Sequence, residues 1–262
     1  MKVLLVGGSG MVGSFITPYL IEKNFTLKVL DIKKPKIDIE WINGSIDDPN
    51  AINQAVKDID AFIWLAMQSP QGGSNTHQDV KIIQENYFTN CLGLHTFLWL
   101  AQEKGISKGI YTSSMSVHYR ERKYFPTENM SLDTPSVYGL SKGFGEKICQ
   151  YFSSWFDMNI IALRITGPRK RNEYIKIRDA KKRVISQEEA DRLRTDLYVT
   201  DEEDLANAYI LSLDKINKGH GRFDPIFIAG DENEEEHNLT KAKQYLGWQP
   251  KSHIKYLSKE KI

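Results

Sequence analysis

Cysteine is scarce in this sequence. Its 262 residues include two cysteines, Cys91 and Cys149, which make no metal-ligand spacing, so we expect free buried thiols in a reducing cytoplasm. A chain of this length can bury a core that needs neither a disulfide nor a structural metal. Five other residues that can bind metals, all histidines, show no metal-ligand spacing either, so the sequence predicts no metal site. They are His77, His95, His220, His237 and His253.

An excess of charge of one sign is also missing. Lysine and arginine total 35, and aspartate and glutamate total 34, which gives a net charge of +1. The densest basic stretches, at 169–171 and 181–183, alternate with acidic residues. They therefore predict a solvated face and no interface with nucleic acid.

Long apolar runs are absent too. The first run, at residues 3–6, ends at Gly7 and Gly8 and is too short for a signal peptide. No later run is long enough to span a membrane. We therefore expect a cytoplasmic protein that makes no membrane contact.

Short apolar runs and amphipathic stretches alternate along the chain. Buried strands are expected at 3–6, 27–31, 61–66, 108–114, 159–165 and 225–229. Helices are expected at 11–23, 49–57, 82–104, 138–155 and 202–213, with a last one that ends near Leu246. This alternation predicts an α/β protein with a doubly wound parallel sheet of the Rossmann type.

The texture of the chain changes after Ile165. Residues 167–196 are highly charged and weakly periodic, in contrast to the apolar runs before them. We expect residues 1–165 to form the Rossmann domain. Residues 166–262 are expected to form a small C-terminal lobe for the substrate, with some interleaved Rossmann elements.

A glycine-rich turn lies directly between the first strand and the first helix. Gly7, Gly8, Gly10 and Gly13 fit both the G-x-x-G-x-x-G and the G-x-G-x-x-G patterns. Glycines here permit a tight turn and a close approach of backbone to pyrophosphate, and a helix N-terminus favours the anion. The turn therefore predicts a dinucleotide site, with a purely structural turn as the alternative.

Asp31 ends the second strand. A carboxylate there accepts hydrogen bonds from the adenosine ribose and repels a 2'-phosphate, which favours NAD over NADP. Lys33 and Lys34 follow closely and oppose that preference. A plain turn residue is the alternative for Asp31.

Tyr138 and Lys142 are four residues apart in a stretch with helical periodicity. Side chains at this spacing share one helix face, so the hydroxyl and the ammonium can point into one cleft. A nearby cation is expected to lower the tyrosine pKa and make the phenol a proton-transfer group. The spacing is common by chance, and it gains meaning from the glycine turn and from Thr112, Ser113 and Ser114.

With these motifs, the chain resembles the extended short-chain dehydrogenase/reductases of the NAD-dependent epimerase/dehydratase group. The matching segments occur in the order of that family and cover most of the chain. They are 7–13, Asp31, 65–66, 90–93, 112–114, 138–142, 163–165, 167–168 and 198–206.

The resemblance implies roles for individual residues. Ser114, not its neighbour Ser113, is expected to orient the substrate, Tyr138 to be the acid/base, and Lys142 to tune it and hold the nicotinamide ribose. Asn90 is expected to lie behind the site as a structural and water-positioning group. The remaining cofactor-binding residues implied for NAD are Gly7, Gly10, Met11, Val12, Gly13, Asp31, Ile46 and Ala66.

The resemblance also bears on the substrate. The segment after Pro168 is shorter than in nucleotide-sugar enzymes of the family, which implies a smaller sugar or sugar acid. Residues 138–146 and 246–251 are similar to those of uronate dehydrogenases, although Met115 and Ser116 replace their Asn-His. Because family dehydratases commonly have an acidic residue where Met115 stands, dehydrogenase and epimerase rank above dehydratase. The alternative from another class is a non-catalytic NAD-binding sensor or scaffold.

Three features stay open in the sequence. His118 could contact substrate or be structural. Arg169, Arg178 or Arg194 could bind a carboxylate, or could be solvated. The apolar helices at 90–101 and 138–155 are candidates for a homodimer interface, and core burial would explain the same residues.

Overall fold

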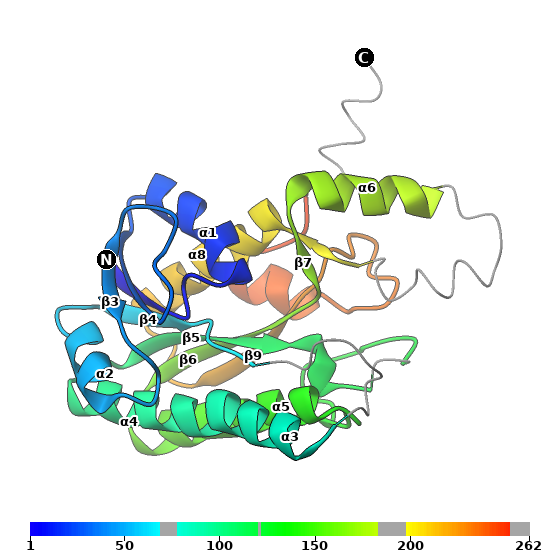
Figure 1. Ribbon diagram of the computed structural model, residues 1–262. Helices are drawn as coiled ribbons and strands as arrows, with labels where there is room; N and C mark the ends of the chain where they lie inside the picture. The colour runs from blue at the N-terminus through cyan, green and yellow to red at the C-terminus, as the bar shows by residue number, and fades with distance from the viewer. Residues whose placement is uncertain (69–77, 120–121, 183–197, 252–262) are drawn as a thin grey trace.

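A parallel sheet of seven strands, in the order β3-β2-β1-β4-β5-β6-β9, forms the centre of the computed structural model (Figure 1). The structure describes residues 1–68, 78–119, 122–182 and 198–251. The strands of the sheet are β1 (Lys2–Val6), β2 (Thr26–Asp31), β3 (Glu40–Asn43), β4 (Ala61–Trp64), β5 (Lys108–Ser114), β6 (Asn159–Ile165) and β9 (Phe223–Ile228). The Rossmann-type sheet expected from the sequence is thereby confirmed.

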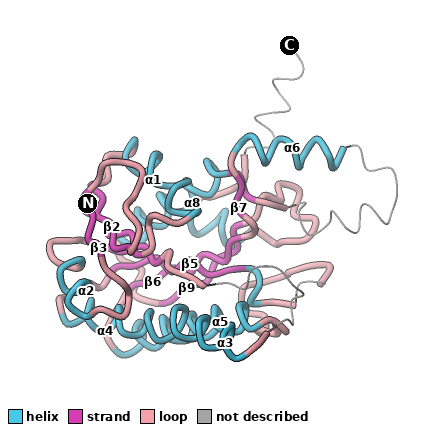
Figure 2. The backbone as a smooth tube through the Cα atoms, viewed as in Figure 1, coloured by secondary structure: helices cyan, strands magenta, loops and turns pink. Residues whose placement is uncertain are grey.

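Helices cover both faces of the sheet (Figures 1 and 2). One face carries α1 (Met11–Glu22) and α8 (Glu202–Asn217), and the other carries α2 (Pro49–Ala55), α4 (Leu94–Glu103) and α5 (Val137–Trp155). Alternation along β1 explains both layers, because Val3 and Leu5 join the core beneath α1 and α8 while Leu4 and Val6 join the opposite core. Alternate side chains of the apolar strand thus pack into the two cores on opposite faces of the sheet.

The edge strand β3 was not expected from the sequence. It has four residues, and none of them is fully buried. Only its pairing with β2, in which Lys28 lies opposite Glu40, identifies it as a strand. Short half-exposed strands lack the apolar run that marks the others.

The long helix expected at 82–104 is present but not uniform. It consists of α3 (Val80–Tyr87), a π-helical turn η1 (Phe88–Gly93) and α4. A π turn contains one residue more per hydrogen-bonded ring than an α turn, which rotates the faces before and after it relative to each other. Asn90 lies within this turn.

The C-terminal part of the chain is interleaved with the main sheet. Both β9 and α8 belong to the Rossmann layers, whereas β7 (Pro168–Arg169) and β8 (Thr200–Asp201) form a separate two-stranded sheet. The helix α6 (Arg171–Lys182) follows β7, and the π-helical turn η4 (Ala242–Leu246) stands where the last helix was expected. In the described residues no helix has the length and apolarity needed to cross a membrane.

Candidate active site

A cavity of about 1210 Å³ opens beside the carboxyl ends of the strands. In an open parallel sheet this edge is where ligands bind. Of the site residues expected from the sequence, all but Asn90 line this one cavity. They are Gly7, Gly10, Met11, Val12, Gly13, Asp31, Ile46, Ala66, Ser114, Tyr138 and Lys142.

The glycine turn forms one end of the cavity with very little room for side chains. Gly7 has a φ of +79°, in the region that favours glycine. A Cβ atom on Gly13 would lie 2.0 Å from the carbonyl oxygen of Gly8. Helix α1 starts after Gly10 with no side-chain cap, so its first N–H groups remain available to an anion. These features fit the pyrophosphate of a dinucleotide.

Asp31 ties the end of β2 to this turn. Its carboxylate accepts hydrogen bonds from the backbone N–H groups of Ser9 and Lys33, each at 2.9 Å. The Ser9 hydroxyl in turn donates to the carbonyl of Lys33 at 2.6 Å. The negative charge of Asp31 is therefore fixed at the cavity wall, where it suits a ribose diol better than a phosphate.

Helix α5 presents successive turns of one face to strand β5. Ser136 caps the helix by accepting a hydrogen bond from the N–H of Gly139 at 2.9 Å. One turn further, Lys142 is 2% exposed and donates from Nζ to the carbonyl of Thr112 at 2.6 Å. The helix face expected from the four-residue spacing therefore exists, and it points at the end of β5.

The two serines at the end of β5 have different partners. The Ser113 hydroxyl donates to Glu146 at 2.5 Å, so it is engaged in the core. The Ser114 hydroxyl accepts from the N–H of Ser116 at 3.1 Å and hydrogen-bonds the Tyr138 phenol. This difference favours Ser114 over Ser113 as the hydroxyl that meets a substrate.

The expected effect of Lys142 on Tyr138 is wrong in this structure. Burial raises the pKa of Tyr138 to about 12, and the hydrogen bond with Ser114 lowers it only in part. The ammonium of Lys142 is directed to the Thr112 carbonyl, and burial lowers the pKa of Lys142 to about 8. The lysine thus titrates closer to neutral pH than the tyrosine does.

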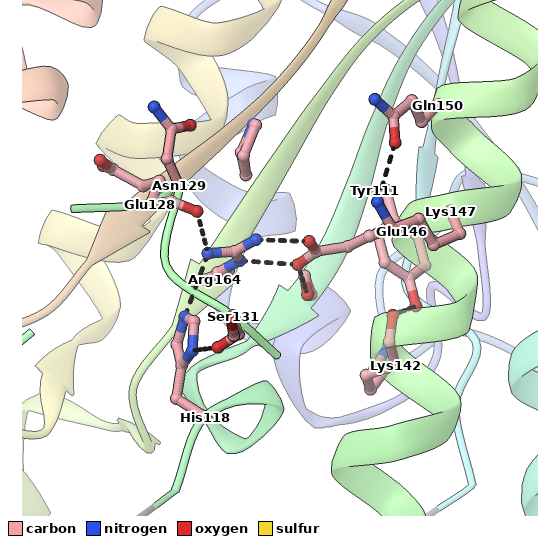
Figure 3. Close-up of polar contacts among 12 residues, drawn as sticks. Tyr111, His118, Glu128, Asn129, Ser131, Lys142, Glu146, Lys147, Gln150 and Arg164 are labelled. Carbon is pink, nitrogen blue, oxygen red and sulfur yellow. Dashed lines mark hydrogen bonds and ion pairs between the residues drawn. The ribbon is translucent and has the colours of Figure 1, made fainter. Parts of the chain in front are cut away.

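A buried ion pair fixes the back of the site (Figure 3). Arg164 on β6 donates to both carboxylate oxygens of Glu146 on α5, at 2.8 and 2.7 Å, and also to the carbonyl of Glu128 at 2.8 Å. The bidentate geometry is the strong form of this pairing. Because Glu146 also accepts from Ser113, the network holds β5, β6 and α5 in one register.

His118 belongs to this network and not to the cavity (Figure 3). Its Nδ1 donates to the carbonyl of Ser131 at 3.0 Å, and its Nε2 accepts from Arg164 at 3.1 Å. Burial, and then the charge of Arg164, lower the pKa of His118 to about 4. Of the two roles left open by the sequence, the structural one is therefore correct.

Asn90 lies behind the cavity. Its side chain accepts from the N–H of Gln68 at 3.0 Å and donates to the carbonyl of the same residue at 2.9 Å. It also donates to the hydroxyl of Ser141 on α5 at 2.9 Å. Asn90 thus joins the loop after β4 to the helix that carries Tyr138, which fits the structural role expected for it.

The opposite wall of the cavity contains residues that the sequence did not indicate. Phe125, Tyr198, Glu236 and His237 line it, and His237 hydrogen-bonds the buried Asp231. No spacing in the sequence marks these residues as a group, because they come from three separate segments. Only the pairing of the segment at Phe125 with the one at His237 brings them together.

Arg169 also lines the cavity. Its guanidinium donates to the carbonyl of Pro168 at 3.0 Å, and no carboxylate among the described residues pairs with it. Arg194 and the side chain of Arg178, the other expected carboxylate binders, lie outside the described part of the chain. The described residues contain no group of three potential metal ligands.

Comparison with known proteins gives a consistent picture. The model of the NAD dependent epimerase/dehydratase family matches residues 3–224. A putative UDP-glucose 4-epimerase from Methanocaldococcus jannaschii is 29% identical over 173 residues, which are 63% of this chain and 55% of that protein. The chain spans about half the length of the curated relatives it matches.

Solved structures share the fold. A mutated uronate dehydrogenase has a TM-score of 0.71 at 22% identity, covering 99% of this chain and 86% of the other. A short-chain dehydrogenase/reductase superfamily protein from Agrobacterium tumefaciens with bound NAD has a TM-score of 0.71 at 17% identity, covering 100% and 99%. At these identities the likeness concerns the fold alone.

Proposed function

Because the chain belongs to the NAD-dependent epimerase/dehydratase family, we propose that it is an NAD-dependent oxidoreductase or epimerase that acts on a hydroxyl of a sugar or sugar acid. The observation that carries this proposal is the single cavity shared by Ser114, Tyr138 and the glycine turn. The domain division at Ile165 and the cytoplasmic location stay predictions.

The residues that would hold NAD line the end of the cavity that the glycine turn and Asp31 form. The N–H groups at the start of α1 would bind the pyrophosphate, and Asp31 would accept hydrogen bonds from the adenosine ribose. Ile46 would pack beside the adenine, Ala66 would line the path of the cofactor, and Lys142 would hold the nicotinamide ribose. The chemistry that NAD supplies when bound is the acceptance of a hydride.

Three side chains then act on the substrate. Tyr138 exchanges the proton of the reacting hydroxyl, and Ser114 donates a hydrogen bond to the oxygen as charge develops on it. With a pKa near 12, the phenol is neutral at pH 7 and is ready to donate a proton in the reductive direction. Lys142, whose pKa burial lowers to about 8, is the group of the pair that titrates nearer to neutral pH.

The outcome depends on the fate of the oxidised substrate. If it leaves, the protein is a dehydrogenase, and if it is reduced again on the opposite face, the protein is an epimerase. Elimination of water would need an acidic group beside Ser114. Met115 occupies that place, so we rank a dehydratase last.

The test is NADH absorbance with purified protein, NAD and a panel of free sugars and sugar acids. We expect NADH to accumulate with one substrate, and Tyr138→Phe to lower the rate by about 10²–10⁴-fold while NAD binding is retained. NAD binding without NADH, together with epimerised sugar, identifies the epimerase. A Tyr138→Phe variant that keeps every activity would support the non-catalytic sensor instead.

We also propose a homodimer through the helices α3 to α5. An apolar groove runs between them, and Trp155, the last residue of α5, is 76% exposed. The groove is lined by Tyr87, Cys91, His95, Phe144, Lys147, Ile148 and Tyr151. A face of this kind on two helices fits a second copy packed as a four-helix bundle.

Light scattering at micromolar concentration tests the dimer. We expect twice the chain mass for the natural protein, and the mass of one chain for Phe144→Glu, because the charge would be buried in the interface. Lys147 also lines the groove but is already charged, so Lys147→Glu is the matched change of charge at a polar position of the lining. A monomeric natural protein would remove this part of the proposal.

A further inference from the structure

The loop after β9 lies on the far side of the catalytic serine from the glycine turn. In the sheet, β2 and β9 are separated by five steps between neighbouring strands, about 24 Å in total at the usual spacing. Strand β5, which ends at Ser114, lies between them. A residue that follows β9 and lines the cavity therefore faces the space beyond the reacting hydroxyl, away from Asp31.

His237 is such a residue, and a buried carboxylate orients it. Its Nδ1 donates to Oδ2 of Asp231 at 3.2 Å. Asp231 is 1% exposed and also accepts from the backbone N–H groups of Glu235, Glu236 and His237, at 3.0, 2.8 and 2.8 Å. Burial raises the pKa of Asp231, but the hydrogen bonds from His237 and the backbone outweigh it and leave the pKa below its usual value.

Two aromatic rings fix the plane of this imidazole. Phe125 stacks on it with ring centroids 5.1 Å apart and planes inclined by 18°. Tyr198 meets it edge to face at 5.7 Å. The ring is thus held on two sides and at one nitrogen, in the way that a positioned side chain requires.

The other nitrogen, Nε2, has no protein partner among the described residues. Some side-chain atoms of the described residues are fully buried and lack a hydrogen bond, but Nε2 of His237 is not one of them. This nitrogen is therefore exposed to the cavity that His237 lines. Because the carboxylate of Asp231 must receive a proton from Nδ1, the neutral ring has its lone pair on Nε2. The wall therefore offers a hydrogen-bond acceptor of fixed direction.

We propose that Nε2 of His237, oriented by Asp231, binds a second hydroxyl of the substrate, distinct from the reacting hydroxyl that meets Tyr138 and Ser114. This assignment rests on the proposed function, because it takes the substrate to be a polyhydroxy compound. A sugar offers several hydroxyl donors, whereas Phe125 and Tyr198 contact His237 through their aromatic rings. The residue would then select which sugar face, and which neighbouring hydroxyl, is accepted.

Chemical modification tests the free nitrogen without turnover. Diethyl pyrocarbonate acylates accessible neutral imidazoles, and peptide mapping reports each histidine separately. We expect His237 to react in the folded protein, and His118 to stay unmodified because both of its nitrogens are engaged. If His237 stays unmodified in the folded protein but reacts once the protein is denatured, the proposal is wrong.

Protection then tests the substrate contact. The same reaction is repeated with the sugar panel on the Tyr138→Phe variant loaded with NAD. This variant turns the sugar over too slowly to consume it during the reaction. Protection of His237 by one sugar, with no protection by the other sugars of the panel, supports the proposal even if that sugar yields no NADH. Reaction of His237 that a turned-over substrate does not slow would overturn the contact and leave the proposed function intact.

Kinetics with a turned-over sugar give the third readout. His237→Asn keeps an amide that can donate to Asp231 but removes Nε2, and we expect KM to rise about tenfold, as for one lost hydrogen bond. The natural protein should also discriminate against one monodeoxy analogue, and His237→Asn should not. His237→Gln, whose amide reaches the place of Nε2, should restore part of the affinity. Equal losses for every deoxy analogue in both variants would point to a structural role only.

Discussion

Two buried histidines contact Phe125, and their hydrogen-bonding partners differ. Their ring centroids lie 5.8 Å (His118) and 5.1 Å (His237) from that of Phe125, and the two residues are 1% and 4% exposed. Both nitrogens of His118 have protein partners, whereas His237 has one partner and one nitrogen on the cavity. Burial therefore does not separate a structural histidine from a functional one, but the number of engaged nitrogens does.

The charges beside the two rings differ as well. Arg164 adjoins His118 and disfavours its protonated form, while Asp231 adjoins His237 and accepts a hydrogen bond from its Nδ1. The first ring is thus kept as a neutral link in an ion-pair network. The second keeps Nε2 at the wall of the cavity.

The largest expected effect concerns the ion pair between Arg164 and Glu146, beside His118. Arg164→Met leaves the carboxylate of Glu146 buried without its cation, and the free energy of unfolding should fall by about 3–5 kcal/mol. Chemical denaturation measures this fall. The double variant Arg164→Met, Glu146→Leu should recover much of it, and a single variant as stable as the natural protein would contradict the role given to the network.

The next effect concerns pH. His118 has a folded-state pKa of about 4, below the ordinary value of 6.5, so its contribution to stability is complete above pH 6.5 and is lost as pH falls towards 4. The full loss is on the order of 3 kcal/mol. Denaturation curves at pH 7 and pH 5 should differ less for His118→Asn than for the natural protein. An unchanged difference would assign the pH dependence to other groups.

The smallest effect is at the ring that the two histidines share. Phe125→Leu keeps an apolar side chain of similar volume, so we expect a loss of only about 1 kcal/mol in the free energy of unfolding. Because the leucine cannot stack on the imidazole, KM should rise by a few-fold. A change in stability with no change in KM would mean that stacking does not position His237.

The sequence predicted the parts of this molecule that depend on neighbouring residues. The strands, the glycine turn and the Tyr138–Lys142 face follow from periodicity and from short spacings, and the structure brings them to one cavity. The partners of those side chains did not follow. The ammonium of Lys142 binds the Thr112 carbonyl, which no residue type in the sequence encodes.

The missed parts depend on contacts between distant segments. The wall at His237 exists because the Phe125 segment pairs with the loop after β9, and that pairing has no local signal. The short edge strand β3 was missed for the same reason, since its partner β2 defines it. His118 was recognised as a candidate from its place near Ser114, and only its hydrogen bonds decided its role.

The π turn at Phe88–Gly93 restricts how the length of this helix can change during evolution. It behaves as a one-residue insertion between two helix halves that each have fixed contacts, because Glu85 in α3 accepts a hydrogen bond from Gln68 and Phe97 in α4 lies in the core. Removing one residue would restore a regular helix and turn one half by about 100° against the other. Evolution can therefore substitute residues in the turn, but an insertion or deletion there would break the contacts of one helix half.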